Sequence, residues 1–132
     1  MKGFAANIGE VARANSSFRK VLYTGKHTQL VLMSLPPSSD IGQETHHDND
    51  QFFHVEAGSG RVVIDGNVHE IKTGSAVIVP AGSEHNVINT SESDDLKLTT
   101  LYSPPHHQDG LERATREEAD ANGADFDGQT TE

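Results

Sequence analysis

Three side chains that can bind a metal ion, Glu44, His46 and His85, could carry the chemistry of this chain. His85 follows a strand and a tight turn in the segment 74–89. Two histidines and one carboxylate with open positions are typical of non-heme iron sites, and the same set suits zinc or manganese acting as a Lewis acid. These residue types indicate a divalent metal site, provided that the fold brings them together.

Composition limits what else the chain can do. Cysteine is absent from the 132 residues, which excludes a disulfide, a thiolate nucleophile and an iron–sulfur cluster. The formal net charge of -10 argues against nucleic acid and membrane surfaces as partners, because both need a basic footprint. No apolar run has the length of a signal peptide or a membrane span, so we expect a cytoplasmic protein.

The length predicts one domain with a core of its own. We place a barrel domain at 1–110, in which the segment 1–17 packs on the barrel or on a partner subunit. An acidic tail follows at 111–132 and carries about half of the net charge. This tail is either disordered or forms a short helix, with Thr115 as its N-cap and Glu118 completing a capping box.

Short bursts of apolar β-forming residues, separated by turn residues, indicate an all-β domain. Asp65-Gly66 is a strong hairpin signal, because a type I′ turn needs positive φ at both central residues. Pro80-Ala81-Gly82 suits a type I turn. Eight strands at this spacing predict a sandwich or a closed barrel. We expect them at 18–24, 27–35, 51–57, 61–64, 67–71, 76–79, 84–89 and 96–102.

Side-chain alternation decides which of the candidate residues can act together. Residues two apart in a strand share a face, so Glu44 and His46 can converge while His47 points the other way. Gln51 opens the next strand on the face that carries its core residues. On a later strand, His85 shares a face with apolar residues, and a buried imidazole needs a partner.

A sequence motif also covers the segment around His85. The chain resembles the cupin superfamily, whose second motif, G-x5-P-x-G-x2-H-x3-N, is matched without a gap by Gly74, Pro80, Gly82, His85 and Asn89. Over residues 18–105 it is similar to a single-domain small cupin and to the metal-binding domain of type II mannose-6-phosphate isomerases. The resemblance implies an all-β fold, a small double-stranded β-helix or jelly-roll barrel.

The first cupin motif, G-x5-H-x-H-x3,4-E-x6-G, is matched less completely. His46 fits its second histidine and Gly58 its closing glycine, whereas Ser38 stands at the opening glycine. Glu44 replaces the first histidine, and Gln51 replaces the glutamate. Glu44 therefore supplies the negative charge that the missing glutamate would contribute.

The resemblance implies a divalent metal ion, one of iron, manganese, zinc, nickel or copper. Carried over residue by residue, Glu44, His46 and His85 would be ligands, with Gln51 as a possible fourth. The amide oxygen of Gln51 is neutral and a weaker donor than a carboxylate, so it binds either directly or through water.

Each ligand has a structural alternative. Glu44 could be an exposed carboxylate at a strand end, and His85 a hydrogen-bonded structural residue. His54 would turn inward only if the register differed at the 47–50 loop. The remaining histidines are expected at the surface or rim rather than as ligands: His27, His47, His54, His69, His106 and His107.

These features predict a metal-dependent enzyme, isomerase- or dioxygenase-like, that acts on a small oxygen-rich molecule. The alternative is a non-catalytic module that binds or senses a sugar or small acid, because no inward-facing residue beyond the ligands is an obvious proton shuttle. We also expect a homodimer, with Phe52 or the segment around Phe4 and Ile8 supplying the contact.

Overall fold

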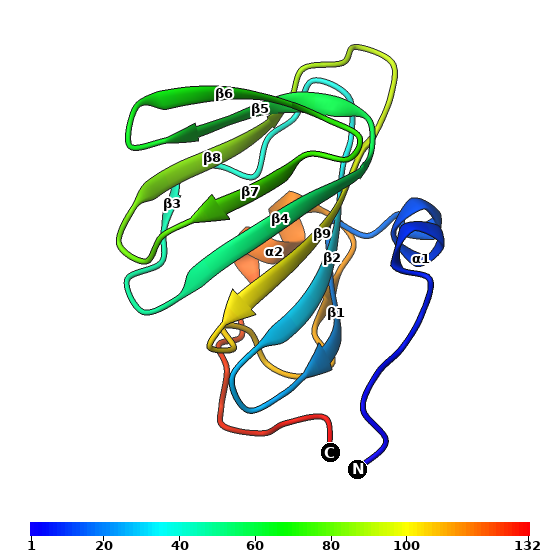
Figure 1. The fold of residues 1–132 in the computed structure, drawn as a ribbon, viewed down its shortest axis with the longest axis vertical. Coiled ribbons are helices and arrows are strands. Elements are labelled where there is room, and N and C mark those ends of the chain that lie inside the picture. Colours follow the sequence, from blue (N-terminus) through cyan, green and yellow to red (C-terminus); the bar gives the residue numbers. More distant parts are fainter.

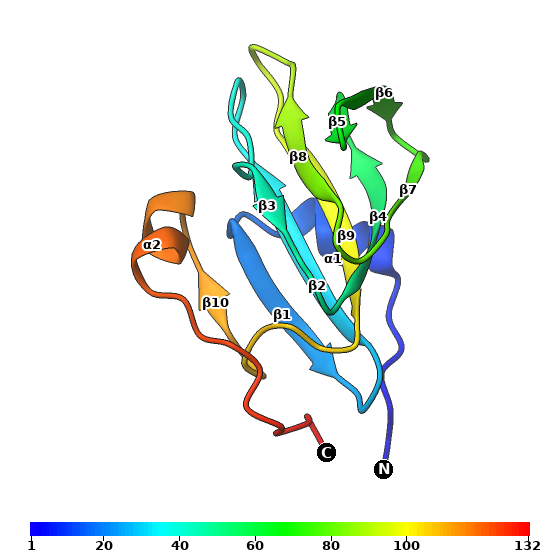
Figure 2. The same ribbon diagram turned by 90° about the vertical axis from the view of Figure 1, so that its left-hand side faces the viewer.

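The computed structural model describes residues 1–132, in which two antiparallel sheets face each other around an apolar interior (Figures 1 and 2). The elements are α1 (Ile8–Ala14), β1 (Arg19–Thr24), β2 (Gln29–Leu35), β3 (Glu44–Thr45), β4 (Asp50–Ala57), β5 (Ser59–Ile64), β6 (Asn67–Lys72), β7 (Ala76–Val79), β8 (Glu84–Asn89), β9 (Leu96–Ser103), β10 (Glu112–Arg113) and α2 (Arg116–Ala121). The larger sheet has the order β10-β1-β2-β9-β4-β7, and the smaller one β3-β8-β5-β6.

All eight predicted strands are present, with bounds that differ by no more than two residues. The structure adds α1, β3 and β10, which alternation did not predict. A two-residue strand such as β3 or β10 shows no alternation to detect. The helix α1 begins after Asn7, whose side chain accepts a hydrogen bond from the Glu10 N–H, and it packs against β9, β4 and β2.

Two local predictions about turns and caps are confirmed. Asp65 and Gly66 have φ values of 47° and 80°, as a type I′ hairpin between β5 and β6 requires. Thr115 caps α2 by accepting a hydrogen bond from the Glu118 N–H at 3.1 Å. The Glu118 carboxylate accepts from the N–H of Ala114, one residue earlier than in a standard capping box.

The acidic C-terminal segment runs back to the start of the chain. Glu132 accepts hydrogen bonds from the Gly3 N–H at 2.9 Å and from the Tyr23 hydroxyl at 2.6 Å. Thr131 accepts from the Thr24 N–H at 2.8 Å, which ties the end of the segment to β1. Both chain termini therefore lie at the same end of the molecule (Figure 1).

Asn89, the last residue of the second motif, joins three separate parts of the backbone. Its side-chain amide is buried and donates to the carbonyl oxygens of Leu35, Pro36 and Asp94 at 3.0, 3.1 and 2.8 Å. Its oxygen accepts from the Ser91 N–H at 2.9 Å. These bonds fix the end of β2 and the loop before β9 against β8, and so constrain the segment that leads to β3.

We predict that Asn89→Asp lowers the free energy of unfolding by roughly 2–4 kcal/mol, because a carboxylate keeps the acceptor but cannot donate to three buried carbonyl oxygens. Chemical denaturation measures the change. Asn67→Asp is the matched control, since Asn67 is exposed and should shift stability by no more than about 0.5 kcal/mol. Equal losses in the two variants would contradict this role of Asn89.

Candidate metal centre

His85 lies on β8 with its imidazole inside the barrel, only 1% exposed. Its Nδ1 lies 3.5 Å from the Ser83 carbonyl oxygen, and its Nε2 is buried with no hydrogen-bond partner. Burial lowers the pKa of His85, so the ring is neutral at pH 7. A neutral ring whose Nδ1–H faces a carbonyl keeps its Nε2 lone pair free, as a metal ligand must.

Pairing between β3 and β8 places Glu44 directly opposite His85. His46 follows β3, and its Nε2 lies 3.2 Å from Glu44 Oε2. One possible ligand atom from each of the three side chains lies within 4.8 Å of the other two. The structure therefore brings together the three residues that side-chain alternation selected, and leaves His47 exposed.

Glu44 remains ionised in this half-buried position. Burial alone would raise the pKa of its carboxyl group, but the hydrogen bond with His46 and the nearby charge of Arg19 outweigh burial and lower the pKa. The nearest atoms of Glu44 and Arg19 are 3.9 Å apart. Its side chain is 28% exposed, so Glu44 is not the freely exposed carboxylate at a strand end that the alternative describes.

The turn between β7 and β8 fixes the position of His46. Gly82 has a φ of 88° and donates its N–H to the His46 carbonyl oxygen at 2.9 Å. The Ala81 N–H donates to Asp50 Oδ1, also at 2.9 Å. The glycine of the second motif thus holds the backbone of the histidine in the first motif, while β8 carries His85.

Gln51 lies in the same interior but is not joined to the other three residues by a hydrogen bond. It is 1% exposed, and its Nε2 donates to Thr100 Oγ1 at 3.1 Å. The Thr100 hydroxyl itself donates to the Phe52 carbonyl oxygen, so it can only accept from Gln51. The amide oxygen of Gln51 is therefore the free atom, buried and without a partner.

A divalent metal ion fits this donor set. Two imidazole nitrogens and one carboxylate oxygen converge, and one of the nitrogens has no partner in the protein. His85 is neutral and Glu44 is ionised, and these are the protonation states in which the two side chains coordinate metals. The unpartnered Gln51 oxygen suits an additional weak ligand or a group that orients a bound molecule.

Arg19 also reaches this interior, a position that the sequence motifs do not predict. It is 9% exposed, and its Nη2 lies 3.9 Å from Glu44 Oε1. Its inward position follows the alternation of β1, in which Arg19 and Val21 are buried and Lys20 is exposed. That alternation was the available signal, but no motif covers β1.

The expectation that His107 lies at the surface is wrong. His107 is 7% exposed, and its Nε2 lies 3.2 Å from the Tyr102 hydroxyl. The segment is held by Gln29, whose amide oxygen accepts from the N–H groups of His106 and His107 at 3.1 and 2.9 Å. Loop residues after β9 have no alternation, so the sequence carries no signal for this burial.

His106 forms a wall of the site. Its ring is half-buried and makes an edge contact with His46 at 4.4 Å between centroids, and it stacks on Tyr102 at 5.3 Å. Burial lowers the pKa of His106. The other histidines match the prediction: His27, His47 and His69 are exposed, and His54 contacts Glu56 from a side chain that is 38% exposed.

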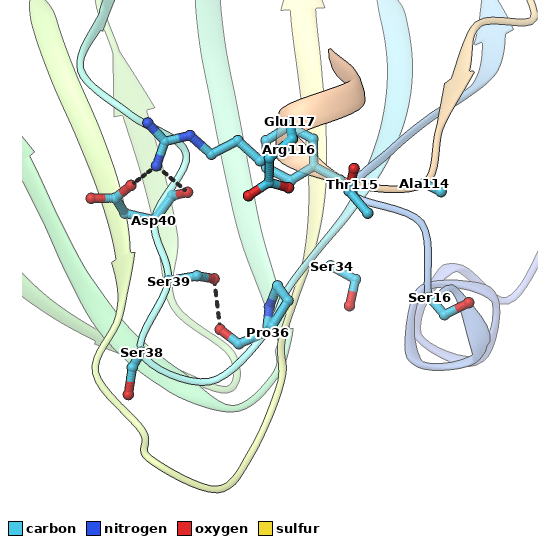
Figure 3. Close-up of a pocket in the computed structure, with 11 residues that line it drawn as sticks. Ser16, Ser34, Pro36, Ser38, Ser39, Asp40, Ala114, Thr115, Arg116 and Glu117 are labelled. Atoms are coloured by element: carbon cyan, nitrogen blue, oxygen red, sulfur yellow. Dashed lines mark hydrogen bonds and ion pairs between the residues drawn. The ribbon is translucent and has the colours of Figure 1, made fainter. Parts of the chain in front are cut away.

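A separate hollow of about 290 Å³ lies between the segment after β2 and the start of α2 (Figure 3). Ser39 and Ser34 contribute hydroxyl groups to it, and Arg116 forms an ion pair with Asp40 across one side. None of its lining residues belongs to the cluster around His85. This hollow is therefore distinct from the candidate metal centre.

Comparison with known proteins matches residues 31–102 to the cupin domain. The uncharacterized protein YrkC of Bacillus subtilis is 41% identical over 124 residues, which cover 89% of this chain but only 66% of that protein's length. The uncharacterized protein L612 of Acanthamoeba polyphaga mimivirus is 38% identical over 92% of this chain and 78% of that protein.

A solved structure from Bacillus halodurans, BH2720, superimposes with a TM-score of 0.89 at 38% identity and covers 92% of this chain and 96% of that one. Together with the two sheets described above, these matches confirm the predicted jelly-roll barrel. None of the helices is long and apolar enough to cross a membrane.

We predict that acid destabilises the fold through His107. Burial first, and then the nearby charge of Arg19, lowers its pKa to about 2. Its ordinary pKa of about 6.5 applies in the unfolded chain, which therefore binds more protons at every pH between the two values. The stabilisation is complete above pH 6.5, and roughly 2 kcal/mol of it is lost between about pH 7 and pH 5.

Denaturation curves across this pH range check the prediction. His107→Gln should lower stability at pH 7, through loss of the Tyr102 contact, but flatten the dependence on pH. His27→Gln is the control, because His27 is exposed and should leave the slope unchanged. A slope in His107→Gln equal to that of the unmodified protein would contradict the assignment.

Proposed function

This chain belongs to the cupin family, and we propose that it is a metal-binding small cupin in which Glu44, His46 and His85 hold a divalent metal ion that acts on a small oxygen-rich molecule. One observation carries the proposal: the three donor groups converge within 4.8 Å, and the buried His85 Nε2 has no partner in the protein. A structural histidine would use both ring nitrogens in hydrogen bonds.

The side chains around the three residues prepare them for this role. Glu44 is held ionised by His46 and Arg19, and His85 is held neutral by burial. Ring contacts of His46 with His106 and Tyr102 fix its plane. When bound, a divalent metal supplies Lewis acidity toward an oxygen atom of a small molecule. The free oxygen of Gln51 can orient that molecule or add a ligand.

We propose an isomerase- or dioxygenase-like reaction. The match of the 74–89 segment to the second cupin motif supports a metal site of the cupin type, which is the kind of site that either reaction needs. Both reaction types need open positions beside the protein ligands, which a set of two histidines and one carboxylate provides.

A non-catalytic binding module is the second candidate, and the shifted pKa values of the buried Tyr102 and His107 favour it. Burial raises the pKa of Tyr102 well above its usual range and lowers the pKa of His107 to about 2, so neither side chain suits a proton shuttle at pH 7. A screen of sugar phosphates, 1,3-dicarbonyls and catechols with each metal separates the two: turnover that is lost in His46→Ala would exclude the binding module.

We predict that the protein, loaded separately with iron(II), manganese, zinc and nickel and then dialysed, retains one of these metals at about one ion per chain. Elemental analysis measures the ratio. His85→Ala and Glu44→Gln should each weaken retention by at least about 10- to 100-fold, because each removes a donor atom.

His47→Ala is the matched control for these variants, since His47 is the exposed neighbour of His46 and should leave retention unchanged. Thermal unfolding of each variant confirms that the fold persists. Absence of stoichiometric metal, or retention in His85→Ala equal to that in His47→Ala, would refute the metal centre.

A further inference from the structure

We propose that Arg19 is an anion-binding residue of this centre and that the small molecule bound there is a carboxylate. The inference rests on the proposed function, because it names the chemical class of the molecule bound at the same site. It starts from an isolated positive charge: Arg19 is 9% exposed, and its Nε is buried with no hydrogen-bond partner.

A buried guanidinium without compensating hydrogen bonds is unfavourable for folding. Its only ion pair joins Nη2 to Glu44 Oε1 at 3.9 Å, which is too long for the charge-assisted hydrogen bonds that arginine normally forms with carboxylates. By contrast, Arg61 donates to Glu70 at 2.8 Å at the exposed surface. Arg19 thus has a buried Nε without a hydrogen-bond partner and only a long ion pair to Glu44.

Holding Glu44 does not account for Arg19. The Glu44 carboxylate has His46 Nε2 at 3.2 Å and lies among the donor atoms of the candidate centre, where a bound metal ion would itself hold the carboxylate. Glu44 supplies the one negative charge of the donor set, so a divalent metal ion would leave the set at about +1, and the guanidinium of Arg19 raises the net charge to about +2. A negatively charged molecule would complement that charge.

The position of Arg19 suits such a molecule. Its guanidinium lies 5.3 Å from the centroid of the Phe18 ring, which supports one face of the planar group. Arg19 is 9% exposed and its Nη2 lies 3.9 Å from Glu44 Oε1, which places the guanidinium within the same interior as the donor cluster. The planar N–H fork of arginine matches the two oxygens of a carboxylate.

A carboxylate fits this interior better than a phosphate. Arg19 is the only arginine or lysine that forms an ion pair with a residue of the cluster, and the rings of His46, His106 and Tyr102 contact one another around His46. A phosphate dianion needs more donors than one fork supplies. Inorganic phosphate therefore serves as the competing probe in the test.

The test measures binding by calorimetry to the full chain, with and without bound zinc. Lactate should bind, whereas its uncharged analogue lactamide should bind at least about tenfold more weakly. Arg19→Gln should raise the Kd for lactate by at least about tenfold, and Arg19→Lys, which keeps the charge but loses the fork, should give an intermediate value. Arg61→Gln is the control and should leave the Kd unchanged.

Two further readouts separate the possible failures. Zinc content should be the same in Arg19→Gln as in the unmodified protein. If the unmodified protein itself does not retain zinc, that result counts against the metal centre and not against Arg19. The midpoint of denaturation of Arg19→Met should be unchanged or raised, because a poorly satisfied buried charge is removed. A lowered midpoint with unchanged lactate affinity in Arg19→Gln would show a structural role and overturn the proposal.

Equal affinities for lactate and lactamide would also overturn it, as would tighter binding of inorganic phosphate than of lactate. In zinc-free protein, lactate should bind more weakly, because Arg19 and Glu44 alone leave the interior nearly neutral. The lactate affinity that remains should still depend on Arg19.

Discussion

The pairing of two short segments, β3 with β8, is the constraint on which the site depends. It sets Glu44 opposite His85 across two hydrogen-bonded strands, and a one-residue slip would turn one of them out of the interior. The register is held from both sides. Gly82 binds the carbonyl oxygen of His46 just beyond β3, and Asn89 ties the far end of β8 to the end of β2. The spacing of Gly82, His85 and Asn89 in the cupin motif is thereby explained by backbone hydrogen bonds around the donor cluster.

Charge is distributed within the barrel in a way that differs from the cupin pattern. The carboxylate lies at Glu44, on β3, and the neutral Gln51 stands where that pattern has glutamate on β4. Arg19 enters from β1 and is held near Glu44 without a close hydrogen bond. An incompletely paired buried charge lowers stability, and an apolar residue at position 19 would pack without that loss. The interior is therefore more readily understood as a ligand site than as a core.

Much of the fold could be predicted from the sequence. Bursts of β-forming residues and turn signals placed the eight main strands, and alternation chose His46 over His47, because both depend on local chemistry. Arg19 and His107 were harder for different reasons. An arginine at the start of a strand is usually at the surface, and only the register with Lys20 and Val21 reveals its burial. His107 is buried through Gln29, which lies far away in the sequence and binds the backbone of the loop after β9.

An anomalous-scattering map from crystals grown with manganese or zinc tests the metal centre most directly. We expect one peak within about 2.0–2.2 Å of a Glu44 carboxylate oxygen, His46 Nε2 and His85 Nε2. A peak at the exposed histidines or near Asp40 and Arg116, or no peak in protein that retains its fold, would contradict the central claim that these three residues form a metal site.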